Sequence, residues 1–353
     1  MIVKIWQIKL TPLSPFHGFP SSDTLFGALC WGIKRIYNES LLTEMLEGFQ
    51  EKPKYIISSA FPCIEHNGNG IFFLPKPITP ALPASDIEKM AQTNEKKEKV
   101  EIITQYKKFK KSEYVSQVIF NRLLNGLSEK VLFQEYREIS GEDKDGEKKF
   151  IMSKTEYELF KTTKPLFRKE LVQKNAIDRL TMSTGEEGQT FYQEEYYTNS
   201  AFKLHFFIKT DDINFFKPVF RYLEDKGIGG NRSTGKGRFK IDVLDEISFE
   251  ESTSRKFITL SRYIPVISEL NIQSNSMFYE IFPYRSKVDS EAEFKGDDIW
   301  KLKVMYLKEG SCFEAKEYKP FYGQCPVVKE IHMQKIRQYG FAFPVFGNFG
   351  GLV

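Results

Sequence analysis

The chain has 353 residues, with 51 Lys and Arg against 47 Asp and Glu, so its formal net charge is only +4. An apolar content of 41% and a charged content of 28% are those of a folded globular protein, and they exclude a disordered tail, a collagen-like repeat and a coiled coil. The length predicts two domains or one large domain with insertions. Because the net charge is small, nucleic-acid binding has to be argued from local patches.

Targeting and metal signals are weak throughout the sequence. No apolar stretch approaches the roughly 20 residues of a membrane span, and the N-terminal MIVKIWQIKL has no small-residue cleavage site. The cysteines lie far apart, at positions 30, 63, 312 and 325, and form no CxxC pair. We therefore expect reduced core thiols in a cytoplasmic protein, with no metal site and no cofactor.

The N-terminal elements begin with a strand over residues 2–10, which is rich in Ile, Val and Trp. A loop with three prolines precedes a helix from about 23 to 38, whose apolar residues recur at helical spacing. Residues 55–61 and 70–75 have the composition of strands, and the turn-like HNGNG between them predicts a hairpin.

Residues 86–160 differ in character from what precedes them. The stretch 96–111 holds seven lysines against two glutamates, 113–127 is a plausible amphipathic helix, and 141–149 is a polar turn. We interpret the region as an insertion on the surface of the first domain.

The segment 161–200 carries two β-prone runs around the turn STGEEGQ, which predicts a long hairpin. The alternation in AFKLHFFIK then predicts a half-buried strand, with His205 and two lysines on its polar face. A helix over 214–226, a glycine-rich loop and the alternating strand RFKIDVL follow.

This order of elements approximates a ferredoxin-like β-α-β-β-α-β unit with decorations, which is an α+β fold. We place the first domain at 1–252, with the insertion at about 86–160 and the hairpin at about 165–200. The charge-rich SFEESTSRK marks the boundary. We expect residues 253–353 to form a second, smaller, β-rich domain that is also ferredoxin-like (RRM-like).

The most informative segment is GIGGNRSTGKGRF, which begins at Gly227 and includes the spacing of a P-loop up to Lys236. The next position is Gly237, where a P-loop needs Ser or Thr for magnesium. The order is also reversed, because a phosphate-binding loop of that kind runs from a strand into a helix. We therefore rank an ATP-binding P-loop low.

The alternative for the same segment is a main-chain cradle for an RNA backbone. Its glycines permit positive φ and close approach, and consecutive amides in such a loop form an anion-binding nest. Four cations follow one another between Gly227 and Lys240 without an acid. The candidate contacts are Gly229, Gly230, Asn231, Arg232, Ser233, Thr234, Gly235, Lys236, Gly237 and Arg238. The competing interpretation is a solvated connection in which Gly227 only ends the helix.

The loop before the first helix is a second candidate anion site, because amides at a helix start favour phosphate. Its candidate residues are His17, Gly18, Ser21, Ser22 and Thr24. Asp23 is most simply the cap of this helix.

At this point the sequence resembles the RAMP proteins of CRISPR systems. The helix, glycine-rich loop and strand near the end of a ferredoxin-like domain carry the resemblance, together with SSDTLFGALCWG, KNAIDRLT followed by TGEEG and FYQEEYY, and the C-terminal YGFAFPV. Within that class they are similar to the type III-A (Csm) effector complex, and to its fourth subunit. The likeness covers nearly the whole chain, although 86–160 and much of 255–335 carry no motif that we can match.

The resemblance implies a subunit without catalysis of its own, which binds and caps the 5′ handle of the crRNA. Its implied partners are the large polymerase-like (Cas ten-type) subunit, the backbone RAMP subunit, and target RNA near the handle–guide junction. It also implies that the hairpin is a thumb that wedges into the guide. The residues it places there are Arg168, Lys174, Asn175, Asp178, Arg179, Phe191 and Tyr192. Ordinary packed aromatics and solvated charges remain open as the alternative for these.

Two other functions remain as alternatives. The first is an RNA-processing endoribonuclease of the RAMP superfamily that uses His17, although a general acid–base pair needs a second group and none stands at a fixed spacing from it. The second is a nucleotide-dependent enzyme with a degenerate P-loop.

Overall fold

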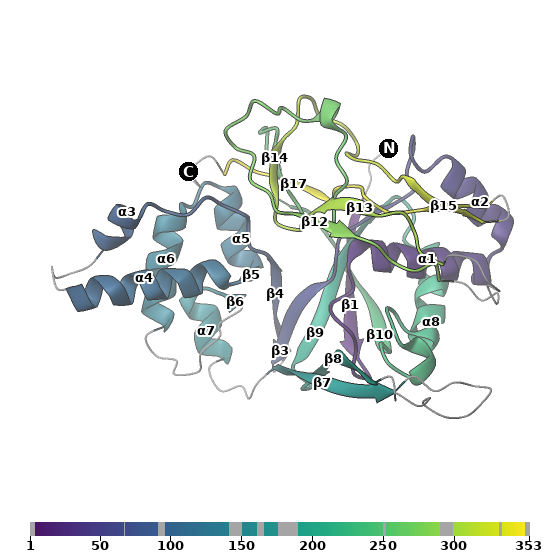
Figure 1. Cartoon of the computed structure of the whole chain (residues 1–353), viewed down its shortest axis with the longest axis horizontal. Coiled ribbons are helices and arrows are strands. Elements are labelled where there is room, and N and C mark those ends of the chain that lie inside the picture. Colours follow the sequence, from purple (N-terminus) through teal and green to yellow (C-terminus); the bar gives the residue numbers. More distant parts are fainter. Residues whose placement is uncertain are drawn as a thin grey trace.

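A computed structural model describes residues 4–66, 68–90, 96–140, 150–160, 166–175, 190–249, 252–289, 299–331 and 334–349. Figure 1 shows a central sheet with a helical region on one side, further helices on the other and a β-rich part above. None of the helices in the described ranges is both long and apolar enough to cross a membrane. The four cysteines are free thiols, as the sequence indicated.

One mixed sheet organises the N-terminal part. Its strands in sheet order are β10 (Phe239–Ile247), β1 (Lys4–Pro12), β9 (Phe202–Thr210), β3 (Phe61–His66), β4 (Asn69–Pro75), β5 (Tyr114–Ser116) and β6 (Phe150–Ile151), with β2 (Ile56–Ile57) also paired to β9. With α1 (Ser22–Ile36) and α8 (Phe216–Lys226), the chain order β1-α1-β3-β9-α8-β10 gives a β-α-β-β-α-β unit. This arrangement is the one expected from the element order.

Helices α1 and α8 pack together on one face of this sheet, and the short α2 (Glu39–Glu47) follows α1 (Figure 1). The apolar positions that recur at helical spacing are the buried ones on both helices. Gly32 allows the close approach, because a Cβ there would lie 2.5 Å from Cγ1 of Val219. Full burial of a side chain such as Val219 contributes about 1.5–3 kcal/mol.

The expectation of a half-buried β9 is wrong at His205, which is completely buried. Its ring nitrogens bond to the side-chain amide of Gln7 at 3.1 Å and to the carbonyl of Phe73 at 2.8 Å. Burial lowers the pKa of His205 to about 4, so the ring is neutral at pH 7. The second sheet face is covered as well, since Phe207 packs on Phe343 from the C-terminal part. Such long-range covering is invisible in the alternation of one strand.

The hairpin around HNGNG exists, but its first strand differs from the prediction. Phe61–His66 pairs with Asn69–Pro75. Of the expected 55–61 strand, Ile56 and Ile57 pair with β9 as the short β2, and Phe61 pairs with β9 as the first residue of β3. The insertion that follows is mainly helical. Its helices are α3 (Ala84–Glu88), α4 (Lys96–Lys111), α5 (Gln117–Leu124), α6 (Glu129–Ser140) and α7 (Lys154–Phe160).

The expected helix over 113–127 begins later than predicted. Residues Tyr114–Ser116 form β5, which extends the sheet from β4, and the side chain of Ser116 accepts a hydrogen bond from the amide of Ile119. This cap sets the start of α5. The predicted polar turn at 141–149 lies outside the described residues.

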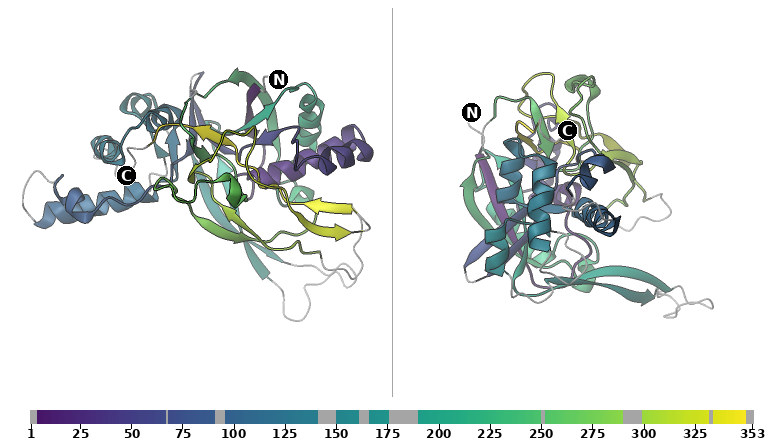
Figure 2. Two further views of the ribbon diagram at one scale, coloured as in Figure 1. Left: turned by 90° about the horizontal axis from the view of Figure 1, so that it is seen from above. Right: turned by 90° about the vertical axis from the view of Figure 1, so that its left-hand side faces the viewer.

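The long hairpin is present as β7 (Phe167–Asn175) and β8 (Thr190–Thr198), paired from Phe167↔Thr198 to Asn175↔Thr190. Figure 2 shows it projecting away from the body of the molecule. The predicted turn STGEEGQ lies outside the described ranges.

The described residues of 252–349 are β-rich. Their elements are β11 (Lys256–Thr259), η2 (Ile267–Glu269), β12 (Ile281–Tyr284), β13 (Val304–Leu307), β14 (Cys312–Glu314), β15 (Val327–Ile331), β16 (Gln334–Arg337) and β17 (Pro344–Phe346). They form a β14-β11-β17 sheet and two two-stranded sheets, and the two helices of a complete β-α-β-β-α-β unit are not found among them. Ile258, Phe341 and Val345 join the hydrophobic core of the N-terminal part. The division into two domains at 252/253 stays a prediction.

Candidate RNA interface

The glycine loop (residues 227–238) leaves α8 and enters β10, and two glycines form its neck. The amide of Ile228 donates to the carbonyl of Gly237 at 2.8 Å. Gly237 has φ +70°, and a Cβ there would lie 2.3 Å from the carbonyl oxygen of Ile228. Gly227 has φ +79°, and its Cβ would lie 2.9 Å from the carbonyl oxygen of Gly237. Side chains are therefore excluded from the neck, which fixes where the loop begins and ends.

Beyond the neck, the loop turns through left-handed positions and presents free amides. Asn231 has φ +61° and Gly235 φ +77°, and they flank the single 3-10 turn η1 (Arg232–Thr234). Within the described parts of the chain, no hydrogen bond reaches the main-chain amides of Gly229, Gly230, Arg232 or Ser233. Free amides on alternating right- and left-handed backbone are the anion-binding arrangement that the sequence suggested.

The loop's cations are partly neutralised by acids from elsewhere in the chain. Arg232 pairs with Asp289, and Nζ of Lys236 lies 2.7 Å from the carboxylate of Glu195 on β8. Arg238 is exposed and has no ion pair among the described residues. A prediction from the loop sequence alone, which contains no acid, therefore overestimates the positive charge of the loop.

Glu195 joins the loop to the β7–β8 hairpin and was not singled out by the sequence. Its carboxylate is buried, and it lies between Lys236 and Lys174, whose Nζ is 2.9 Å away. Burial alone would raise the pKa of this carboxyl, but hydrogen bonds from Lys236, Lys174 and Tyr197 outweigh burial and lower the pKa to about 2. A second link runs from the side-chain amide of Asn231, whose Nδ2 donates to Oε1 of Gln193 at 2.6 Å. The loop and the hairpin base are thus one connected unit.

The outer half of the hairpin presents aromatic rings to solvent. Phe191 and Tyr192 are 48% and 65% exposed, so they are not the packed strand aromatics of the alternative interpretation. Asn175 is exposed beside them, while Arg168 bonds to Glu170 at 2.7 Å. Asp178 and Arg179 lie outside the described residues.

The loop before α1 is fastened to the same hairpin. Phe16 and Tyr196 exchange both main-chain hydrogen bonds, and Nδ1 of His17 lies 2.7 Å from the carbonyl oxygen of Glu194. Because a carbonyl only accepts, this nitrogen donates, and Nε2 of the exposed imidazole faces away from the bond. Gly18 has φ +71° with open space around its Cβ position.

The start of α1 differs from the prediction. Ser22, one of the candidate contacts, is fully buried, with its main-chain amide bonded to the Ser59 hydroxyl and its own hydroxyl bonded to the main-chain amide of Arg262. Asp23 is not a cap: Oδ1 lies 3.1 Å from the Arg262 guanidinium, and Oδ2 accepts from Gln338 at 3.2 Å. The N-cap position belongs to Ser21, whose hydroxyl contacts Thr24 at 3.1 Å. The physical reason is that the C-terminal part covers this helix end.

No cluster of His, Cys, Asp and Glu that would suit a metal ion occurs in the described residues. The glycine loop also lacks the direction of a P-loop, because its amides follow the C-terminal end of α8. The glycine loop supplies free main-chain amides and the unpaired Arg238, and the hairpin beside it supplies exposed aromatic rings. These are the components of a single-stranded RNA surface.

Comparisons with known proteins agree with this arrangement of glycine loop and hairpin. No protein-family model matches the chain. A curated protein of Thermococcus onnurineus (strain NA1), "CRISPR system Cms protein Csm4", is 26% identical over 267 residues, which cover 74% of this chain and 75% of that protein. The protein of the same name from Methanocaldococcus jannaschii is 36% identical over 89 residues, or 23% of this chain and 24% of that protein.

Solved structures show the same fold. A chain from the Csm3–Csm4 subcomplex of the type III-A CRISPR–Cas interference complex aligns with a TM-score of 0.64 at 21% identity, covering 97% of this chain and 99% of that one. A chain of a Csm1–Csm4 cassette in complex with cA4 aligns with a TM-score of 0.54 at 17% identity, covering 98% of each. The chain therefore shares the fold of these structures over nearly its whole length.

The chain is thus similar to a curated Csm4 protein over most of its length, and its fold is that of a chain from the type III-A Csm3–Csm4 subcomplex. The resemblance expected from the sequence is thereby confirmed.

Proposed function

We propose that the protein is an RNA-binding subunit of a type III-A effector complex. It binds and caps the 5′ handle of the crRNA in the cytoplasm, and it joins the large polymerase-like subunit to the backbone RAMP filament. Similarity to Csm4 chains that were solved with Csm3 and with Csm1 supports these two protein partners.

The proposal of RNA binding rests on one observation, which is that Glu195 connects the glycine loop to the β7–β8 hairpin. The free amides of the glycine loop and the exposed Arg238 are suited to handle phosphates. Phe191 and Tyr192 are suited to stacking on unpaired bases near the handle–guide junction. Since Glu195 forms ion pairs with both Lys174 and Lys236, the glycine loop and the hairpin present their contacts as one connected unit.

The proposed role is structural rather than catalytic. His17 is exposed, but its only described hydrogen bond is to the main chain of Glu194, and no second titratable group bonds to its ring within the described residues. General acid–base cleavage of RNA needs two such groups. We therefore expect purified protein to bind repeat RNA without cutting it; cleavage that His17→Ala abolishes would replace this proposal with the endoribonuclease.

Binding is tested with Arg238→Gln, measured on labelled handle RNA over a series of salt concentrations. The salt slope is the slope of log binding constant against log salt concentration. Loss of one phosphate contact on a single strand lowers its magnitude by about 0.7. The matched control is Arg221→Gln on α8, an exposed arginine paired with Glu224 outside the loop. Equal slopes for wild type and Arg238→Gln would contradict contact between this loop and the RNA.

A further inference from the structure

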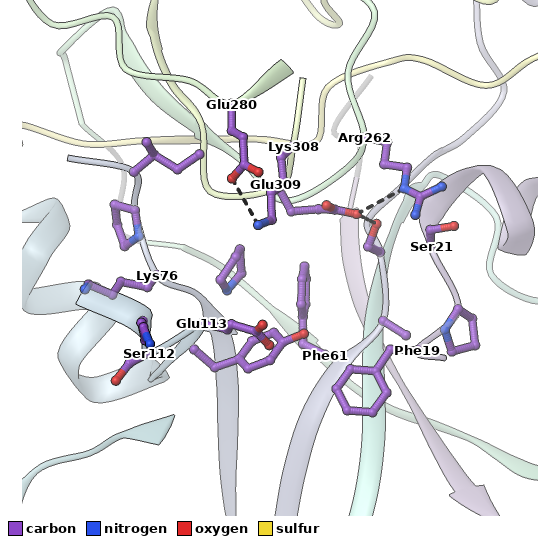
Figure 3. A pocket seen from close by; sticks show the side chains of 18 of the residues that line it. Phe19, Ser21, Phe61, Lys76, Ser112, Glu113, Arg262, Glu280, Lys308 and Glu309 are labelled. Carbon is purple, nitrogen blue, oxygen red and sulfur yellow. Dashed lines mark hydrogen bonds and ion pairs between the residues drawn. The ribbon is translucent and has the colours of Figure 1, made fainter. Parts of the chain in front are cut away.

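A cavity of about 600 Å³ lies where four parts of the chain meet, and no local sequence pattern predicts it. Its walls come from the loop before α1, the insertion around β5, the base of the β7–β8 hairpin, and the β12–β13 region of the C-terminal part. Figure 3 shows side chains from these parts facing a common space. The volume lies within the range of sites for small organic ligands.

One side of the cavity is aromatic. Phe19 lies 6.1 Å from Tyr114 and 5.3 Å from Tyr196 between ring centroids, and Phe167 lies 5.7 Å from Tyr196. All four rings line the cavity and are partly exposed, although Tyr196 stacks on Phe16 and Tyr114 stacks on Phe150. The exposed parts of these rings form an aromatic surface on which a flat ligand can pack.

The rim carries both free and paired charges. Lys308 pairs with the exposed Glu280 at 3.1 Å, while Lys111 is exposed and has no ion pair among the described residues. Glu113 is likewise exposed without a described side-chain partner. Figure 3 shows it across the space from Lys308. A ligand with an anionic end and a hydrogen-bond donor at its other end therefore fits.

The cavity and the glycine loop lie on opposite sides of one strand. Tyr196 faces the cavity and its neighbour Glu195 faces Lys236, because successive side chains of a strand point to opposite faces. An RNA chain that crosses the hairpin base thus contacts both.

We propose that this cavity binds one unpaired nucleotide of the RNA held by the protein. The base stacks against the wall of Phe19, Tyr114, Phe167 and Tyr196, and an exocyclic amino group donates to Glu113. The adjoining phosphate lies toward Lys111 and Lys308. This inference rests on the proposed function and adds a specificity site to it. A bare polyanion is disfavoured, since the free Glu113 would repel it, whereas a base with an amino group satisfies the carboxylate.

The test uses the full-length protein and labelled handle RNAs in which one nucleotide at a time is made abasic. We expect one position at which loss of the base weakens binding about 5- to 100-fold in the wild type. Tyr114→Leu, which keeps apolar bulk, removes that sensitivity at the same position only. Glu113→Ala reduces discrimination against uracil at that position, and a melting curve verifies that each variant is folded.

Lys111→Gln combined with Lys308→Gln weakens binding and lowers the salt slope by about 0.7, for one phosphate of a single strand. Lys107→Gln on the same helix is the control, because Lys107 is exposed and does not line the cavity. AMP serves as a further probe for a free nucleotide.

Handle binding that depends on Arg238 but is indifferent to Tyr114→Leu, Glu113→Ala and the paired lysine variant would overturn the inference and leave the proposed function intact. Binding of AMP with the same dependence on Glu113, without an effect on RNA, would assign the cavity to a free nucleotide and also overturn it. Failure of the wild type to bind handle RNA would overturn both.

Discussion

Replacement of Glu195 by Gln tests whether one buried carboxylate fastens the glycine loop to the hairpin. The substitution keeps the size of the side chain and removes the charge that Lys174 and Lys236 share. Both lysines then lose their charged partner beside a buried site. We expect a less stable protein and a glycine loop that is no longer held against the hairpin.

The magnitude follows from the pKa of Glu195, which falls from an ordinary 4.5 to about 2 in the folded protein. A difference of about 2.5 between the folded and unfolded values corresponds to about 3 kcal/mol of folding free energy at pH 7. The two lysines are 23% and 24% exposed, so solvent screening reduces this to about 2 kcal/mol. Because the folded-state pKa is the lower one, the contribution is complete above about pH 5 and is lost as the pH falls toward 2.

The assay is urea unfolding of wild type and Glu195→Gln at pH 7, pH 5 and pH 3. The matched control is Glu170→Gln, since Glu170 stands directly opposite Glu195 in the hairpin and pairs with Arg168 at the surface. The control changes the same charge on the same pair of strands, and an exposed pair contributes less than about 1 kcal/mol.

Two results would refute this reasoning. One is a Glu195→Gln variant whose unfolding free energy at pH 7 matches that of Glu170→Gln. The other is a deficit that persists unchanged at pH 3, because the wild-type contribution is partly lost there.

Two further changes test the loop neck and the helix start. Gly237→Ala should destabilise the protein by more than about 2 kcal/mol, since its Cβ would meet the carbonyl of Ile228 at 2.3 Å. Gly235→Ala, in open space, should cost about 1 kcal/mol. Similar melting temperatures for the two variants would contradict the claim that the neck of the loop excludes side chains. Asp23→Asn should cost about 3 kcal/mol in urea unfolding, because it leaves the Arg262 guanidinium partly uncompensated. Unfolding unchanged from wild type would show that Asp23 does not join α1 to the C-terminal part.

Local patterns in the sequence were sufficient for most of the N-terminal unit. The spacing of apolar residues in α1 and α8 gave both helices, because a helix buries a single stripe. The β-prone runs around STGEEGQ gave the β7–β8 hairpin, and the glycines gave the loop between α8 and β10. The same patterns misplaced β3 and the start of α5, where neighbouring strands decide which residues pair.

The sequence by itself determined the order of elements and the composition of the glycine loop, since glycine content, helical spacing and strand alternation are properties of neighbouring residues. Only the tertiary structure decided how that loop is charged, because Glu195 and Asp289 approach it from 41 and 57 residues away along the chain. It also decided that His205 and Ser22 are buried, and that four separate segments enclose the cavity beside Glu113. Burial and charge pairing between distant segments follow from packing of the whole chain, which no local pattern encodes.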